Sequence, residues 1–157
     1  ASDVYKRQYI FKLISIHTAS DNIDLQFQGS TDSGSNYNTT ITSTFFRAQH
    51  AENDDDPNLS YMTSDDLAQS TSAQRVSVPT GNDNDTSLSG TLKLFLPSST
   101  TFVKHFISDV NNKDMSHYTV NCFMAGYCNV TTAIDGVQFS YSTGNIQNGV
   151  IKLYGIS

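Results

Sequence analysis

The sequence predicts an all-β fold, a sandwich or barrel of about eight antiparallel strands. Thr, Val, Ile, Phe and Tyr are plentiful, and such residues fit the pleated, half-buried surface of a sheet. Apolar residues alternate with a period of two, and no window holds the 3.6-residue period of an amphipathic helix. Turn-forming residues recur about every ten positions, which is the spacing of short strands in a sandwich or barrel.

The first part of the chain contains three predicted strands. Residues 9–16 carry apolar side chains on both faces and predict a central strand. Residues 23–29 alternate strictly between apolar and polar side chains, which predicts a strand with one buried face. A cluster of Thr, Asp, Ser, Gly and Asn at 31–36 predicts a turn, after which a long strand is expected over 37–50.

The middle of the chain, residues 51–85, is acidic and polar and has no hydrophobic period. A run of aspartates followed by Pro57 is excluded from a central strand, because proline lacks an N–H donor and neighbouring carboxylates repel one another. We expect a long polar excursion here, with one or two short strands near 59–62 and 74–78.

Regular alternation returns in the second half of the chain. It predicts five further strands, at 86–96, 101–110, 118–129, 134–142 and 149–156. In the last of these, Val150, Lys152 and Tyr154 share one face, while Ile151 and Leu153 share the other. Because an unpaired edge strand promotes aggregation, we expect this strand to complete a sheet and to lie inside the fold.

Size, charge and hydropathy restrict the class of protein. At 157 residues the chain is long enough for one well-buried core and too short for two. A net charge of −6 argues against a nucleic-acid partner, because neutralising phosphates requires a basic patch. Membrane insertion is not expected, since no run approaches the roughly 20 apolar residues that a spanning helix requires.

Cys122 and Cys128 are the only cysteines of the chain. On one extended strand they lie roughly 20 Å apart, far beyond the ~7 Å limit between the Cα atoms of a disulfide. We therefore expect buried free thiols. The alternative is a disulfide, which requires a tight turn at residues 125–126.

Five segments of the chain match, in order and spacing, a pattern found in a family of small structural proteins of tailed phages, particularly marine ones. The segments are residues 41–48 (ITSTFFRA), 81–85 (GNDND), 94–106 (LFLPSSTTFVKHF), 142–146 (STGNI) and 151–156 (IKLYGI). The chain resembles this family of virion proteins over most of its length from residue 9 onward. The resemblance implies a single β-sandwich domain of the jelly-roll type over residues 9–157, and it brings no assigned chemistry.

Residues 1–8 resemble a different kind of sequence. They look like a peptide that recurs at the broken ends of assembled environmental sequences. We therefore expect residues 1–8 to be non-native and the native chain to begin earlier, since the family that the chain resembles carries one or two further strands before the segment that matches residue 9. A processed N-terminus and a boundary introduced by cloning are the alternatives.

Two sets of polar side chains are candidates for a chemical site. The histidines are His17, His50, His105 and His117. They lie in no motif with Cys, Asp or Glu at ligand or triad spacing, so we expect structural roles for them. Asp83 and Asp85 are the candidate metal ligands, because they alternate with asparagines in a pattern like half of a calcium loop. This run lacks the glycine and the distant glutamate of an EF-hand, and an Asx-rich turn is the simpler interpretation.

No catalytic residue and no cofactor are expected. Glycoside hydrolysis requires two acids that face a cleft, whereas the acids here cluster in loops and Glu52 is the only glutamate. The chain also has no Trp to form a platform for stacking a sugar.

The leading hypothesis is a non-enzymatic virion structural protein, either a capsid decoration protein or a component of the tail or its fibres. We expect a homo-oligomer, with a trimer favoured, that binds other virion proteins. We expect the protein to be synthesised in the host cytoplasm and to be located on the extracellular virus particle. Tyr61 and Phe102 are the candidate interface residues, because aromatic side chains anchor many interfaces.

The alternative hypothesis is a glycan-binding module that attaches the phage to its host. Jelly rolls are a common lectin architecture, although fold alone does not establish function. The polar excursion at 51–85 is where a binding surface is expected, and host surface glycans are then the partner.

Overall fold

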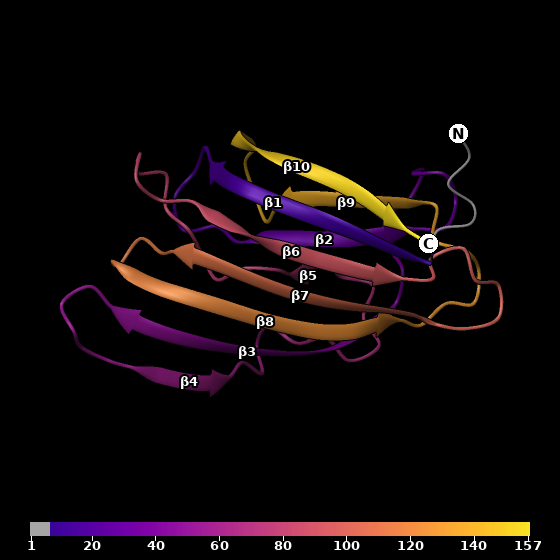
Figure 1. Ribbon diagram of the computed structural model, residues 1–157, viewed down its shortest axis with the longest axis horizontal. Coiled ribbons are helices and arrows are strands. Elements are labelled where there is room, and N and C mark those ends of the chain that lie inside the picture. The colour runs from indigo at the N-terminus through magenta and orange to yellow at the C-terminus, as the bar shows by residue number, and fades with distance from the viewer. Residues whose placement is uncertain (1–6) are drawn as a thin grey trace.

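The computed structural model describes residues 7–157, and residues 1–6 lie outside the described residues. Of the segment expected to be non-native, only Arg7 and Gln8 are described, and Gln8 begins the first strand. The described chain consists of β-strands and contains no helix (Figure 1), so the predicted all-β fold is confirmed. Between residues 7 and 157 there is no helix of the length and apolarity needed to cross a membrane.

Residues 7–157 form ten strands in two antiparallel sheets. The strands are β1 (Gln8–Thr18), β2 (Leu25–Ser30), β3 (Ile41–Ala51), β4 (Asn58–Tyr61), β5 (Gln74–Arg75), β6 (Leu88–Phe95), β7 (Lys104–Lys113), β8 (Tyr118–Cys128), β9 (Gly136–Tyr141) and β10 (Ile146–Ile156). The large sheet has seven strands in the order β10-β1-β6-β7-β8-β3-β4, and the small sheet has three in the order β5-β2-β9. Figure 1 shows the large sheet in front of the small one.

The strand pattern follows the sequence closely. Eight strands lie where the alternation places them, although the strand predicted over 37–50 begins only at Ile41. The two short strands β4 and β5 fall inside the polar excursion, at the two positions expected for them. The division into seven and three strands forms a sandwich, and it does not confirm the jelly-roll arrangement.

The core lies between the sheets, where their inward faces meet. In β7, buried and exposed side chains alternate along the strand, so that Phe106 and Val110 face the core. The ring of Phe106 meets Phe27 of β2 edge to face, with ring centroids 5.0 Å apart. Phe11 of β1 packs against Phe139 of β9 in the same way, at 5.3 Å. These contacts place the small sheet against β1 and β7.

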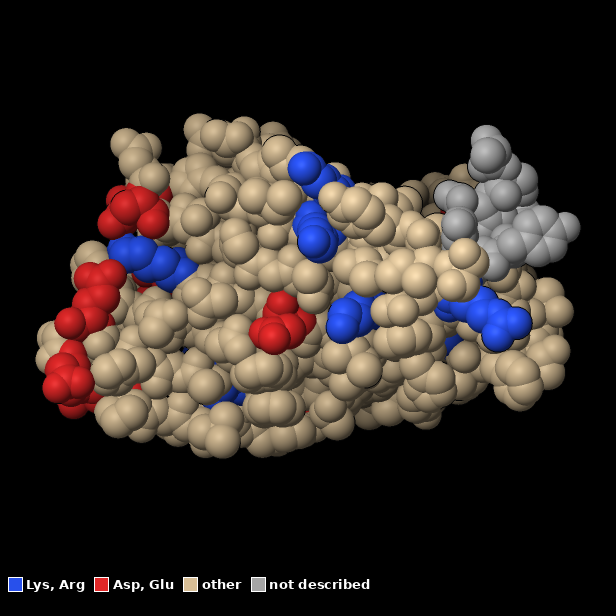
Figure 2. All heavy atoms as spheres, in the orientation of Figure 1, with Lys and Arg blue, Asp and Glu red and all other residues tan. Residues whose placement is uncertain are grey.

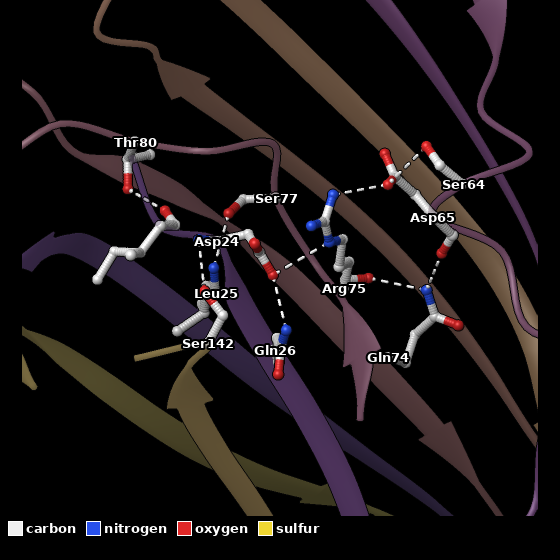
Figure 3. Close-up of polar contacts among 11 residues, drawn as sticks. Asp24, Leu25, Gln26, Ser64, Asp65, Gln74, Arg75, Ser77, Thr80 and Ser142 are labelled. Carbon is white, nitrogen blue, oxygen red and sulfur yellow. Dashed lines mark hydrogen bonds and ion pairs between the residues drawn. The ribbon is translucent and has the colours of Figure 1, made fainter. Parts of the chain in front are cut away.

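A buried polar cluster joins the polar excursion to both sheets (Figure 3). Arg75 of β5 lies between two carboxylates: its Nε atom is 3.3 Å from Asp24, and its Nη1 atom is 2.7 Å from Asp65. Those carboxylate side chains are only 4% and 3% exposed, so Arg75 neutralises charges that water barely reaches. The adjacent Gln74 accepts a hydrogen bond from Ser43 of β3 and donates to the backbone carbonyl of Asp65.

The last strand, β10, is an edge strand and does not lie inside the fold. In the described chain it pairs with β1 alone, and all eleven of its residues are exposed. The prediction that it completes a sheet is confirmed, whereas its expected placement inside the fold is wrong. The reason is that the seven-stranded sheet is wider than the three-stranded sheet, so Leu153 on the inner face remains 56% exposed. β1 is central, between β10 and β6, as its two apolar faces predict.

The pairing of β10 with β1 is regular only over residues 150–156. Before this segment the register shifts, opposite His17. Gly149 lies at this point with a φ of 118°, and a Cβ atom there would lie 2.7 Å from the backbone oxygen of Ser15. Glycine is therefore required where the chain enters the regular part of β10.

Both cysteines lie on β8 and face the core as free thiols, as expected. Burial raises the pKa of Cys122 from 9.0 to about 12 and the pKa of Cys128 to about 11. The folded protein therefore holds both sulfur atoms in the protonated, unreactive form.

We predict that Arg75→Met lowers the free energy of unfolding by about 2–4 kcal/mol, because it removes the cation that neutralises two buried carboxylates. The partial exposure of the guanidinium limits the loss. Urea unfolding at pH 7 measures the loss. Arg75→Lys is expected to lose less, since it keeps the charge without the planar fork. A loss below about 1 kcal/mol for Arg75→Met would show that the cluster does not stabilise the fold.

We predict that neither thiol reacts with a thiol reagent at pH 8 until urea unfolds the chain. Above pH 9 the unfolded chain loses thiol protons that the folded chain keeps, so the free energy of unfolding is expected to fall as the pH rises from 9 toward 11. The double variant Cys122→Ala, Cys128→Ala is expected to show a smaller fall. Rapid labelling of the native protein, or equal slopes in the two proteins, would contradict this prediction.

Candidate functional site

The histidines are dispersed over the molecule. The Nδ1 atom of His17 lies 2.7 Å from the carbonyl oxygen of Thr86, which gives this ring a backbone partner. The ring of His105 meets Tyr127 edge to face, with centroids 6.1 Å apart. Among residues 7–157, no three His, Cys, Asp or Glu side chains are grouped so that they could hold a metal ion.

His50 and His117 lie at the acidic end of the sandwich, where β3 and β7 finish and where Figure 2 shows Asp and Glu gathered. They line two adjoining open hollows, and Glu52 lines both. The Nε2 atom of His50 is 3.3 Å from Asp54, and the Nδ1 atom of His117 is 3.9 Å from Glu52. These side chains are all well exposed, so water screens both contacts. The arrangement is a solvated polar surface.

The candidate metal ligands, Asp83 and Asp85, lie in the loop that precedes β6. Lys113 donates a hydrogen bond of 2.9 Å to the carboxylate of Asp85, which lowers the pKa of that carboxyl group and raises the pKa of the lysine. The backbone carbonyl of Asp83 accepts hydrogen bonds from the N–H and the hydroxyl of Thr86, at 3.0 and 2.8 Å. The segment is a turn closed by Thr86, in which a lysine neutralises one of the two carboxylates.

The candidate interface residues, Tyr61 and Phe102, are 52% and 65% exposed and lie on different elements. Tyr61 is on the edge strand β4, where its hydroxyl donates to Asp66 at 2.5 Å. Phe102 lies in the loop between β6 and β7, where its backbone N–H donates to Ser99. Both rings are thus exposed, on separate elements of the fold.

Tyr61 begins a row of aromatic side chains on the outer face of the large sheet. It is opposite Phe46 of β3, which is in turn opposite Phe123 of β8. The rings of Phe46 and Phe123 stack with centroids 5.0 Å apart and planes 15° apart. This spacing is close to the ~4.8 Å between neighbouring strands, so the rings stand upright and turn their edges to solvent. A sugar stacks on a ring face, so this pair does not form a sugar platform.

The free edge of β10 is apolar on both faces. Its exposed apolar side chains are Ile146, Val150, Ile151, Leu153, Tyr154 and Ile156. Lys152 is the only charged residue in the strand, and the strand contains no proline. Natural sheets blunt their edges with charges, prolines or very short strands. With eleven residues and one charge, β10 is open to pairing with another strand.

An open apolar hollow of about 590 Å³ lies beside this edge. Its lining includes Leu153 of β10, Phe11 of β1, Leu94 of β6 and Val137 of β9. The hollow therefore lies between the inner face of the large sheet and the small sheet, on the side where β10 extends without cover.

Lys104, which the sequence analysis did not single out, holds the loop that borders this hollow. It is fully buried at the start of β7, and its Nζ atom donates to the backbone carbonyls of Val130 at 3.0 Å and Thr132 at 2.7 Å. Burial lowers its pKa. The inward position of Lys104 could have been recognised from the alternation of side chains along the strand. Lys104 lies on the same face as Phe106 and the other inward residues.

Comparison of the chain with protein-family models, with curated proteins and with solved structures finds no match.

We predict that Phe46 and Phe123 stabilise the sheet as a pair. In a double-mutant cycle with Phe46→Ala and Phe123→Ala, the coupling free energy is expected to be about 0.5–1.5 kcal/mol, as for other stacked aromatic pairs. Urea unfolding of the wild type, the two single variants and the double variant measures it. Strictly additive losses would show that the stacked rings contribute no mutual stabilisation.

Proposed function

We propose that the chain is a non-enzymatic structural subunit of a virion, a capsid decoration protein or a component of the tail or its fibres, and that it acts as a homo-oligomer. The virion assignment rests on the resemblance of five sequence segments to structural proteins of tailed phages. The assembly rests on one observation, the open apolar edge at β10. The extracellular particle is then the location of the protein, and other virion proteins are its partners.

The edge at β10 supports assembly because a solitary subunit gains nothing from it. Six exposed apolar side chains line a strand whose outer backbone groups have no neighbouring strand in the described chain. Such an edge promotes uncontrolled association unless a defined partner covers it. In a homo-oligomer that partner is a second copy of the chain, which is present wherever the subunit is made.

The polar groups of the described chain support a structural role. The buried carboxylates of Asp24 and Asp65 are neutralised by Arg75, and this cluster fastens the polar excursion to the sheets. The exposed carboxylate of Asp85 is paired with Lys113. These groups stabilise the fold and its loops, and none of them is placed as an acid–base pair over a hollow.

Light scattering on a size-exclusion column tests the assembly. With a subunit mass of 17.2 kDa, we expect a mass of at least two whole subunits that persists on dilution into the micromolar range. Gold-labelled antibodies against the chain, applied to purified particles of the phage that encodes it, test the location. A one-subunit mass at every concentration would contradict the assembly, and unlabelled particles would contradict the virion role.

A second candidate function, glycan binding for host attachment, is favoured by one hollow. Glu52 and Asn53 of the polar excursion line it together with His117 and Tyr118, which gives a carboxylate, an amide and an aromatic ring in one place. Those are the groups that sugars require. Binding on a glycan array that Glu52→Ala abolishes would support this candidate, and an array without signal would exclude it.

A further inference from the structure

We propose that β10 pairs in antiparallel fashion with β10 of a second copy of the chain, about a twofold axis beside Leu153, and that the two seven-stranded sheets thereby form one continuous sheet. This inference rests on the proposed function, because it names the contact through which the subunit assembles. Both copies use the same surface, as a twofold interface requires.

The backbone of β10 offers donors and acceptors to a second strand at alternate residues. The N–H of Lys113 donates to the carbonyl of Ser87 at 3.2 Å, so the odd-numbered residues of β6 bond to β7 and its even-numbered residues bond to β1. The odd-numbered residues of β1 lie opposite these even-numbered residues and bond to β6, which leaves the even-numbered residues of β1 to bond to β10. In the observed register this leaves Ile151, Leu153 and Gly155 with their N–H and C=O groups directed to the free edge.

One register of the two strands satisfies these groups. The regular part of β10, residues 150–156, is centred on Leu153. Pairing about this centre sets Leu153 opposite Leu153 of the second copy and Ile151 opposite Gly155 of the second copy. The three edge residues of each copy then exchange up to six N–H···O=C hydrogen bonds. No residue of the regular segment is left without a counterpart.

The same register suits the side chains of the outer face. It sets Val150 opposite Ile156 of the second copy, and Lys152 opposite Tyr154 of the second copy. The ring of Tyr154 already receives an ammonium group, since the Nζ atom of Lys12 lies 5.5 Å from its centroid. A shift of two residues in one direction instead sets Lys152 opposite its own counterpart, which is repulsive. A shift of one residue sets the inner face of one strand against the outer face of the other.

The inner face of the pair covers the apolar hollow at its open side. A twofold axis perpendicular to the sheet keeps both small sheets on the same face of the combined sheet. The two Leu153 side chains then meet beside the two hollows that they line. The most exposed of the large apolar side chains of β10 thus becomes the centre of an apolar contact.

The apolar surface that β10 leaves in water is extensive. Six of its eleven residues are large hydrophobic side chains, and each of these is at least 37% exposed.

The opposite edge of the large sheet is guarded against the same pairing. β4 has four residues, and the chain enters it directly after Asp54, Asp55, Asp56 and Pro57. Three carboxylates repel a second copy, and proline removes a donor. Edge pairing is therefore directed to β10.

Leu153→Cys tests the twofold centre directly. Residues opposite each other in a hydrogen-bonded pair have Cα atoms ~5.5 Å apart, which a disulfide spans. We expect mild oxidation to convert Leu153→Cys into a covalent dimer. Ile156→Cys is the matched control, because it lies roughly 20 Å from its own counterpart in this register and remains unlinked. The native thiols, which are buried, do not contribute.

Charge substitutions at the same position supply a second test. Leu153→Lys and Leu153→Glu are each expected to raise the dissociation constant of the pair at least about tenfold, because like charges meet at the axis. An equimolar mixture of the two variants is expected to restore the pair as a heterodimer. Leu59→Lys on β4 is the control, since it places the same charge on the guarded edge and leaves the association unchanged. Urea unfolding of each variant verifies that the exposed substitutions preserve the fold.

The outcomes separate this inference from the proposed function. A dimer that Leu153→Cys locks and that the mixed charge variants restore supports both. A wild-type protein that is monomeric at every concentration overturns both. An oligomer, including the trimer favoured by the sequence, that persists in Leu153→Lys and stays unlinked in Leu153→Cys overturns the β10 pair and leaves the proposed function standing.

Discussion

The position of the polar excursion against the two sheets depends on the ion pairs that Arg75 makes with Asp24 and Asp65. β5 has only two residues, so its ladder with β2 contributes little by itself. Arg75 adds a charged contact to Asp24, directly before β2, and another to Asp65 within the excursion, and Gln74 extends the connection to Ser43 of β3. Because an unpaired buried carboxylate is costly, other positions of the excursion relative to the sheets are disfavoured. A segment that is polar throughout its sequence is thereby held in one place.

Much of the fold could be predicted from the sequence because the parity of side chains along a strand is a local property. The alternation in residues 23–29 and 134–142 predicts β2 and β9, and the loss of alternation predicts the polar excursion with its two short strands. Strand order is not local. The edge position of β10 follows from the pairing of β1 with β6, whose residues are far apart in the sequence, and no alternation reports that pairing.

The candidate sites were less predictable for the same reason. A run of acids and amides at 81–85 resembles a cation loop until Lys113, from the end of β7, is seen to neutralise Asp85. Single exposed aromatics such as Tyr61 are recognisable in a sequence, but an apolar strand that lacks cover is not. Ile151 and Leu153 of β10 alternate with polar neighbours as core residues do, and only the width of the small sheet determines that they stay exposed.

The contrast between the two edges of the large sheet determines the valency of the subunit. A strand edge that accepts a copy of itself consumes that edge in both molecules, so two subunits joined through β10 present only β4 at either end. In the proposed pair, acidic residues and a proline lie beside each terminal strand of the combined large sheet, so neither end favours a further copy. The proposed contact would thereby stop at two subunits. An edge that promotes fibre growth in other sheets would here make a single connection.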